Sequence, residues 1–526
     1  MKSGKQNGLF ISEGFLAFVV VLIALGLRLL HVLFTTGGNP LAPDLTLDAA
    51  IYDRWAKVLV WGGAPVPTHL MQTPLYPWMI SLVYHLAGPS LTAVRLVQAV
   101  MGAASCAFII VITRRLFRSS TAGIIAGAAG ALYLPFIFYE GVLVPATPII
   151  FLNLLAVLLL VPERRDPGPG RILVAGIVLG MSVIAKPVAL LLVPFAALHL
   201  FFSPRHGSDM HEADAGRRKP HPSLFLKQSA ILAAGIILTL IPLTVKNYRL
   251  TGEFIPLTTG GGINFYIGNN ERANGFYTVP FYEGEPIGGT PEEQQRQMRS
   301  IAAAEAGREL TYNEVSRFWL QKGIRYITKN PGEWTGLAWR KFIFFWNRYE
   351  RANVENMQFH RRFGGIPSLP LLTFGIVAPF ALLGVFMTRN RWRDLWLLYG
   401  GIIAYLAAAI LFYVLARYRL PAVPFLLPFA GAAVTGMLKL LRSGQRAEPA
   451  VLAAALVILF YFTNMTVAAD TPAGTAGNLK RLGNAYLSRG DTTSAVEIYR
   501  EAARTDPADS TLRHRLELLE RRYHKR

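Results

Sequence analysis

Three carboxylates are gathered in one polar stretch, residues 43–77, between the first and second long apolar segments of the chain. They are Asp44, Asp48 and Asp53. If this stretch is helical, Asp44 and Asp48 share one face with Tyr52, whereas Asp53 points roughly 140° away from Asp48. An acidic stretch directly after an apolar segment can present an ionised carboxylate at a membrane surface. A carboxylate beside a hydroxyl can accept its proton, which is the chemistry of a general base.

Basic side chains form a second candidate group, because they lie in or at the ends of apolar segments, where charges are costly. If the first apolar segment runs outward, five of them reach the same outer level, beside Glu140: Arg28, Lys186, Lys246, Arg417 and Arg419. Cations at one depth can bind the oxygens of a lipid phosphate or pyrophosphate. Taken singly, each cation could instead snorkel or form an internal ion pair. Their common depth favours phosphate binding.

The composition predicts a membrane protein. Of 526 residues, 52% are hydrophobic and only 16% charged, whereas soluble domains carry about 25% charged residues. The formal net charge of +21 would suggest a nucleic-acid partner in a soluble protein. Here much of the excess lies in short loops between apolar segments, where it indicates membrane topology, so no nucleic acid is expected. The single cysteine, Cys106, excludes an intrachain disulfide and a thiol metal cluster.

The apolar segments predict about eleven membrane spans, each near the length of about 20 residues that a bilayer requires. They are 13–34, 91–113, 121–139, 143–161, 171–186, 187–202, 228–246, 367–388, 395–415, 420–438 and 449–467. The connecting segments rich in Arg or Lys all fall on one side if the first span runs outward: 114–118, 163–171, 203–227, 389–394 and 439–446. The positive-inside rule then places that side and the N-terminus in the cytoplasm, with the first span as an uncleaved anchor.

Three regions face outward in this topology: the acidic loop 35–90, the long segment 247–366 and everything after 467. The acidic loop contains a short apolar piece, 74–88, expected to lie along the outer surface. The long segment ends in an aromatic and basic run, 333–356, which suits a helix lying in the headgroup layer. Stacking of these aromatic rings on sugar is the alternative.

The C-terminal region, 468–526, carries the most specific soluble motif and is predicted as a domain separate from the membrane part, 1–467. Its spacing is that of a tetratricopeptide repeat: Leu482, Gly483, Tyr486, Ala495, Tyr499, Ala502 and Pro507. A helix over 512–522 is expected to cover the exposed face of this repeat. Because one repeat cannot bury a continuous core alone, it must pack against the protein's own outer loops or bind another protein.

Four stretches, in this order, carry a family resemblance. They are LDAAIYDRWA (47–56), TPLYPWMISLVYHLAG with VRLVQAVMGA (73–103), FYIGNNERANGFY (265–277) and RYRLPAVPFLLPF (417–429). The chain resembles the GT-C superfamily of polyprenyl-phosphate-sugar glycosyltransferases over most of residues 13–440. Within it, the chain is similar to the protein-mannosyltransferase and aminoarabinose-transferase-like branch of bacterial inner membranes. The resemblance implies an all-α polytopic membrane protein with a GT-C-type helix bundle.

The resemblance also implies an inverting sugar transfer on the periplasmic face, from a polyprenyl-phosphate donor to a hydroxyl of a protein, lipid or polysaccharide. The carboxylate that serves as base or orients the acceptor falls on Asp48, with Asp53 as fallback and Glu140 as the assisting acidic residue. Many members carry Asp-Glu where this chain has Asp48-Ala49. The alternative role of Asp48 is that of an N-cap or solvated helix residue. A divalent metal is allowed but not required, and the sequence has no spaced His and Asp ligand cluster.

Two other functions remain open at this point. A polymerase or ligase of polyprenyl-diphosphate glycans would also need the outer arginines. A non-catalytic membrane scaffold would act through the C-terminal repeat, and would lose function without residues 470–526 but not with Asp48→Asn. A transporter is less favoured, because the hydropathy shows no inverted repeat.

Overall fold

The computed structural model describes residues 12–63, 70, 72–163, 167–202, 222–282, 284–443, 447–468 and 470–523. Within these ranges the regular structure is almost entirely helical. The one sheet described is a two-stranded antiparallel ribbon of β1 (Phe281–Tyr282) and β2 (Glu285–Pro286). The predicted all-α class is therefore confirmed.

Apolar helices coincide with every predicted span. Five are long and apolar enough to cross a membrane: α1 (Glu13–Gly38), α4 (Leu91–Phe117), α10 (Pro222–Thr251), the segment Ala416–Arg442, and α20 (Ala447–Asn464). The segment Ala416–Arg442 is continuous and consists of α18 (Ala416–Arg419), η5 (Leu420–Ala422) and α19 (Val423–Arg442). Shorter apolar helices match the others: α5 (Ser120–Ala131), α7 (Ala146–Leu160), α8 (Pro169–Ala185), η1 (Pro187–Leu192) with α9 (Val193–Phe202), α16 (Phe374–Met387) and α17 (Trp396–Leu411). The protein is thus a polytopic helical membrane protein, and the number of spans stays a prediction.

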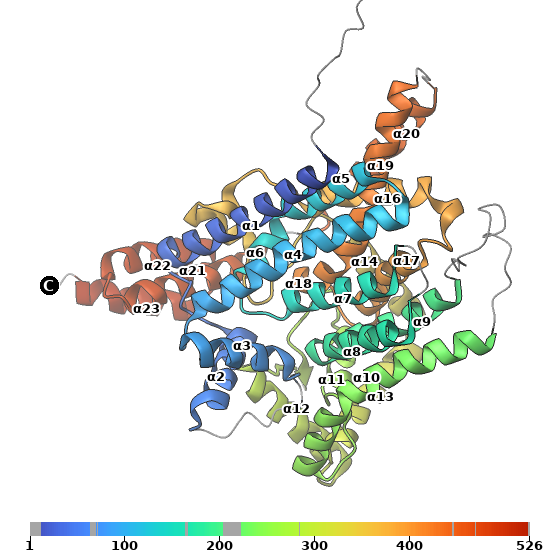
Figure 1. Cartoon of the computed structure of the whole chain (residues 1–526). Helices are drawn as coiled ribbons and strands as arrows, with labels where there is room; N and C mark the ends of the chain where they lie inside the picture. The colour runs from blue at the N-terminus through green and yellow to red at the C-terminus, as the bar shows by residue number, and fades with distance from the viewer. Residues whose placement is uncertain are drawn as a thin grey trace, which may run out of the picture.

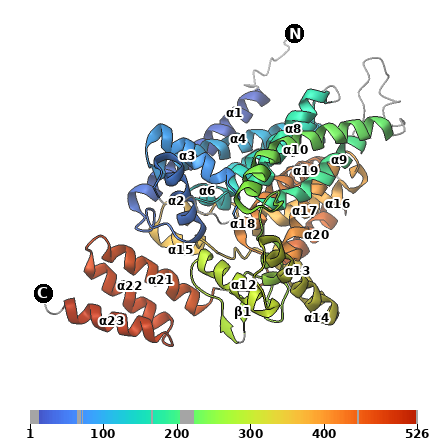
Figure 2. The same ribbon diagram turned by 90° about the horizontal axis from the view of Figure 1, so that it is seen from below.

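Glycines let the bundle helices approach closely, as is usual for helices packed in a membrane. Helices α8 and α10 lie side by side in both views (Figures 1 and 2). A side chain at Gly176 of α8 would meet the carbonyl oxygen of Leu232, and one at Gly235 of α10 would meet that of Leu173. The pair therefore packs backbone to backbone.

Most of the remaining helices lie outside the predicted spans; Leu134–Glu140 overlaps the end of 121–139, and Ile366–Ser368 overlaps the start of 367–388. The remaining helices are α2 (Leu47–Trp61), α3 (Leu75–Ala87), α6 (Leu134–Glu140), α11 (Gly261–Gly268), α12 (Pro291–Ala306), α13 (Tyr312–Lys329), α14 (Pro331–Trp346), α15 (Met357–His360), η2 (Arg361–Phe363), η3 (Ile366–Ser368), η4 (Arg389–Arg391), α21 (Pro472–Leu487), α22 (Thr492–Thr505) and α23 (Ser510–Tyr523). In Figure 1, α2, α3, α12 and α21–α23 lie at one end of the bundle, opposite the start of α1. Figure 2 places α21 and α22 near α15, and Phe359 of α15 packs against the core of the three C-terminal helices.

Two local expectations are changed by where the helices begin and end. Asp44 does not share a helix face with Asp48, because α2 begins only at Leu47. Asp48 is not an N-cap, because Thr46 occupies that position. In the C-terminal region, α21 and α22 contain the residues of the predicted repeat except Pro507, which lies between α22 and α23. The assignment of this hairpin as a tetratricopeptide repeat stays a prediction.

Candidate active site

Asp48 lies in the first turn of α2, where the positive end of the helix dipole stabilises a carboxylate. Its Oδ2 is 2.7 Å from Nη2 of Arg417, and Gln72 Nε2 donates to its Oδ1 at 3.0 Å. The Asp48 side chain is 20% exposed and that of Arg417 only 8%. Leu47, directly before Asp48, has φ of 49°, a region that costs a branched side chain energy and is often found at functional sites.

The charge of Asp48 is maintained by its neighbours. Burial alone would raise the pKa of this carboxyl group, but Arg417 and Lys186 together with the hydrogen bond from Gln72 hold the pKa below its ordinary value. Asp48 is therefore ionised at neutral pH.

Lys186 completes a cationic pair beside Asp48. It lies at the break between α8 and η1, and its Nζ is 4.6 Å from the ring centre of Tyr418. The Tyr418 hydroxyl oxygen accepts from Lys186 Nζ and from Arg417 Nη2, both at 3.3 Å. Two cations therefore converge on this one hydroxyl oxygen.

Two cavities meet at these residues. A cavity of about 390 Å³ is lined mostly by apolar side chains of α7, η1 and α17, and a cavity of about 180 Å³ is lined mostly by polar side chains. Asp48, Gln72, Tyr277 and Asn353 line only the polar one. Both are lined by Tyr52, Lys186, Pro187, Asn264, Tyr413, Leu415, Arg417 and Tyr418. An amphiphile with an anionic head fits this arrangement, with its head at the cations.

The other predicted cations have partners of their own. Arg419 lines the apolar cavity, but its guanidinium is 2.7 Å from Glu350 and donates to the Phe345 carbonyl at 3.0 Å. Lys246 Nζ lies 5.8 Å from the ring centre of Trp55 and lines neither cavity. The predicted role of both in phosphate binding stays a prediction.

Arg28 and Glu140 lie together but away from the cavities. Arg28 Nε is 2.6 Å from Glu140 Oε2, with side chains 1% and 7% exposed. Asp53 faces away from Asp48, as the helical spacing predicts, and accepts from Tyr84 at 2.6 Å and from Lys57 at 2.8 Å. The structure thus brings Asp48, Lys186 and Arg417 together, while the catalytic roles predicted for Glu140 and Asp53 stay predictions.

Sequence reasoning missed Gln72 and Tyr418. Each lies in or next to a stretch that carried the family resemblance, 73–88 and 417–429, so the motif pointed to the segment but not to the side chain. Asn264, to which the Tyr413 hydroxyl donates at 2.6 Å, also lies next to such a stretch. Asn353 had no such signal.

A divalent metal does not fit beside Asp48. Lys186 and Arg417 already surround this carboxylate with positive charge, and a second cation there would be repelled. Among the residues that the structure describes, no group of three or more His, Cys, Asp and Glu side chains could hold a metal ion. The positive charge beside Asp48 is instead supplied by the side chains of Lys186 and Arg417.

Residues 71–213 match the family model of dolichyl-phosphate-mannose-protein mannosyltransferases. No curated protein matches the sequence. Among solved structures, the apo oligosaccharyltransferase of Archaeoglobus fulgidus matches with 12% identity and a TM-score of 0.46, over 90% of this chain and 58% of that one. The same enzyme, AglB, with an inhibitory peptide and a dolichol-phosphate matches with 12% identity and a TM-score of 0.47, over 89% and 58%.

ArnT from Cupriavidus metallidurans bound to undecaprenyl phosphate matches with 14% identity and a TM-score of 0.36, over 90% of this chain and 87% of that one. The chain spans 58% of the length of the archaeal oligosaccharyltransferase chains. The family match over residues 71–213 includes the stretch TPLYPWMISLVYHLAG and Lys186. Over these residues the match confirms the resemblance to protein mannosyltransferases that the sequence indicated.

Proposed function

We propose that the protein is a membrane glycosyltransferase that moves a sugar from a polyprenyl-phosphate donor to an acceptor hydroxyl, with inversion, on the periplasmic face of a bacterial inner membrane. One observation carries this proposal. The ionised Asp48 contacts Arg417 where an apolar and a polar cavity meet. The description of the matching family, which names a dolichyl-phosphate-linked sugar, supports a donor of this class.

The donor lipid occupies the apolar cavity, and its phosphate lies against Lys186, Arg417 and the Tyr418 hydroxyl. Charge-assisted hydrogen bonds to phosphate oxygens are the strong ones, and an arginine fork matches their geometry. The sugar then lies in the polar cavity, where amide and phenol groups can bind its hydroxyls. A phosphate also competes with Asp48 for Arg417, so donor binding makes the carboxylate more basic.

Transfer follows as a single displacement. Asp48 takes the proton of the acceptor hydroxyl as its oxygen forms a bond to the anomeric carbon. The bond from that carbon to the phosphate oxygen breaks, and its electron pair stays on the lipid phosphate. Lys186 and Arg417 stabilise the charge that develops on this leaving group. One displacement inverts the anomeric carbon.

The test is transfer from a panel of radiolabelled polyprenyl-phosphate sugars by the purified chain, with membrane extract as the source of acceptors. Asp48→Asn is expected to lose about 10²- to 10⁴-fold in rate, the usual contribution of a base. Asp53→Asn is the matched control, because this carboxylate on the same helix faces Tyr84 and Lys57. A chelator is expected to leave the rate unchanged.

Other outcomes select other functions. Equal rates for wild type and Asp48→Asn would reject Asp48 as the base, and Glu140→Gln would then be measured. Products that form a ladder of lengths from diphosphate donors would indicate a glycan polymerase. No transfer from any donor by folded protein would favour the scaffold that acts through its C-terminal helices.

A further inference from the structure

The three C-terminal helices form a packed unit. Its core consists of Ala476, Leu479, Tyr499, Ala502 and Leu512, all nearly fully buried. The Tyr499 hydroxyl donates to Asn484 Oδ1 at 2.7 Å and links α22 to α21. This unit contacts the rest of the protein through two segments, residues 39–46 and 349–363.

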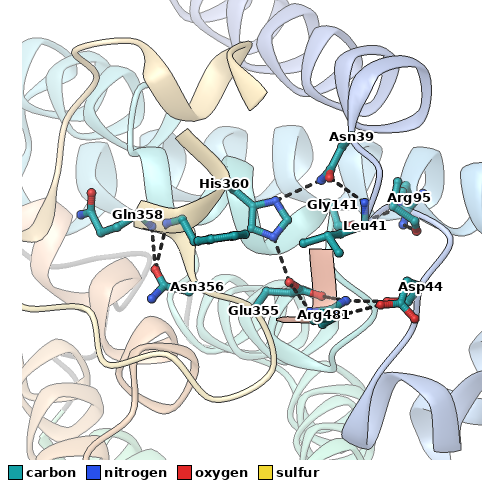
Figure 3. A network of polar contacts seen from close by, with 12 residues as sticks. Asn39, Leu41, Asp44, Arg95, Gly141, Glu355, Asn356, Gln358, His360 and Arg481 are labelled. Atoms are coloured by element: carbon teal, nitrogen blue, oxygen red, sulfur yellow. Dashed lines mark hydrogen bonds and ion pairs between the residues drawn. The ribbon is translucent and has the colours of Figure 1, made fainter. Parts of the chain in front are cut away.

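Arg481 of α21 bridges these two segments (Figure 3). Its Nε is 2.9 Å from Asp44 Oδ2, and its Nη2 donates to the Asp44 carbonyl at 2.5 Å. On its other side, Nη2 and Nη1 lie 2.8 and 3.0 Å from the two carboxylate oxygens of Glu355. The Arg481 side chain is 16% exposed and that of Glu355 13%, so water screens this forked pair only weakly.

Neighbouring polar groups fix both partners of Arg481 (Figure 3). His360 Nε2 lies 2.9 Å from Glu355, and the Asn39 amide nitrogen donates to His360 Nδ1 at 3.0 Å. Burial alone would raise the pKa of Glu355, but the hydrogen bonds from His360 and Arg481 hold it below its ordinary value. Arg95 of α4 donates to the Ala42 carbonyl at 2.6 Å. The segment 39–46 is thus held from three directions.

Apolar side chains seal the same contact. Leu41 of the first segment is buried together with Leu482 and Ala485 of α21, and Phe359 and Phe363 pack against them. Burial of such apolar side chains stabilises the contact. The C-terminal unit therefore docks onto the protein's own outer segments, which is one of the two arrangements expected from the sequence.

Both docked segments lead directly to the candidate active site. Asp44 precedes Asp48 by four residues. On the other segment, Asn353 lines the polar cavity, and the Arg351 carbonyl accepts from the backbone nitrogen of Ala416, next to Arg417. Arg481 consequently cross-links the segment that carries the carboxylate to the segment that supports its arginine partner.

We propose that the C-terminal unit is a positioning element of the active site and that Arg481 is the residue through which it acts. By holding residues 39–46 against residues 349–363, Arg481 keeps Asp48 facing Arg417 and the donor phosphate. This inference rests on the proposed transferase function. It assigns to the last three helices a role in the reaction that needs no second protein.

The test compares three full-length variants in the transfer assay. Arg481→Gln is expected to lower kcat about tenfold to a hundredfold, the cost of a misplacement of about 1 Å at a reacting group. KM for the donor should stay within about twofold, because the lipid cavity is untouched. Arg481→Lys should restore part of kcat. Arg500→Gln is the matched control, because Arg500 pairs with Glu520 at 2.7 Å within the C-terminal unit.

Amide hydrogen exchange in the same proteins separates this inference from the proposed function. Arg481→Gln should exchange faster than wild type over residues 39–52, and Arg500→Gln should not. Faster exchange with reduced kcat supports positioning. Unchanged exchange or an unchanged kcat in Arg481→Gln overturns it. If wild type transfers no sugar from any donor, the positioning role falls with the transferase proposal, and faster exchange would then show the docking contact alone.

Discussion

At the scale of single residues, the main feature is that Asp48 and Arg417 neutralise each other at 2.7 Å. Removing one partner of a buried pair leaves an uncompensated charge, which is strongly destabilising. A substitution of Arg417 would therefore mix structural and catalytic effects. Gln72 offers a milder change, because it is an uncharged donor that holds the same carboxylate through one hydrogen bond at 3.0 Å.

We predict that Gln72→Leu moves the acid limb of the pH profile of kcat/KM to higher pH. The hydrogen bond from Gln72 lowers the pKa of Asp48, so its loss raises that pKa, and the carboxylate protonates earlier as pH falls. At neutral pH the rate should drop by no more than about tenfold, the worth of about one hydrogen bond. Gln295→Leu, a residue that lines the same cavity, should keep the wild-type profile. An unshifted limb in Gln72→Leu would mean that a group other than Asp48 titrates.

At the scale of elements, the cavity wall depends on helix ends that one lysine holds together. Lys341 of α14 is fully buried, and its Nζ donates at 2.9 Å to the Gly268 carbonyl, the last residue of α11, and to the Ile410 carbonyl near the end of α17. The ammonium group thus satisfies carbonyls that helix C-termini leave open. The residues that follow α17 include Tyr413, which lines both cavities.

Lys341 makes the stability of this region depend on pH. Burial lowers its pKa to about 7, whereas an unfolded lysine has a pKa of about 10.4. Between about pH 7 and the unfolded pKa, the unfolded chain binds more protons at this lysine than the folded chain does. The free energy of unfolding therefore rises with pH in this window, and the increase is complete above the unfolded pKa. We predict that the thermal midpoint of wild type, relative to Lys341→Met, increases from pH 7 to 9.5 at one scan rate. Lys329→Met, at the exposed end of α13, should show no such trend; a constant difference for Lys341→Met would contradict the prediction.

The elements were more predictable than their contacts. Hydropathy located the apolar helices because a segment that crosses a membrane must satisfy its backbone hydrogen bonds internally, which a helix does. The period of the helix was enough to separate Asp53 from Asp48. It could not show that Glu140 pairs with Arg28, because that depends on how α1, α4 and α6 cross. Nor could it show that Arg481 lies against Asp44, 437 residues earlier.

At the scale of the whole molecule, the connections that follow α4 and α16 lie at one end, and α2, which carries Asp48, lies toward the other (Figure 1). Arg391 donates to the Leu116 carbonyl at 2.8 Å, and Arg114 lies 3.2 Å from Glu163. Three of the arginine-rich connections, 114–118, 163–171 and 389–394, therefore meet at a single face. The positive-inside rule requires that one face carry all five basic connections. These three agree with it; 203–227 and 439–446 lie partly outside the described residues, so the topology stays a prediction.

This arrangement predicts the orientation of the protein in the membrane. We expect a cysteine introduced at Ser488, exposed in the C-terminal unit, to react with a membrane-impermeant maleimide in cells whose outer membrane is permeabilised. A cysteine at Asn390, exposed at η4, should react only after lysis. Cys106 is buried and provides the unlabelled background. Basic loops held in the cytoplasm put Asp48, Arg417 and the C-terminal unit on the periplasmic side, where a lipid-linked sugar would be used. Labelling of Asn390→Cys before lysis, with Ser488→Cys protected, would show the opposite orientation and would contradict the proposed side of transfer.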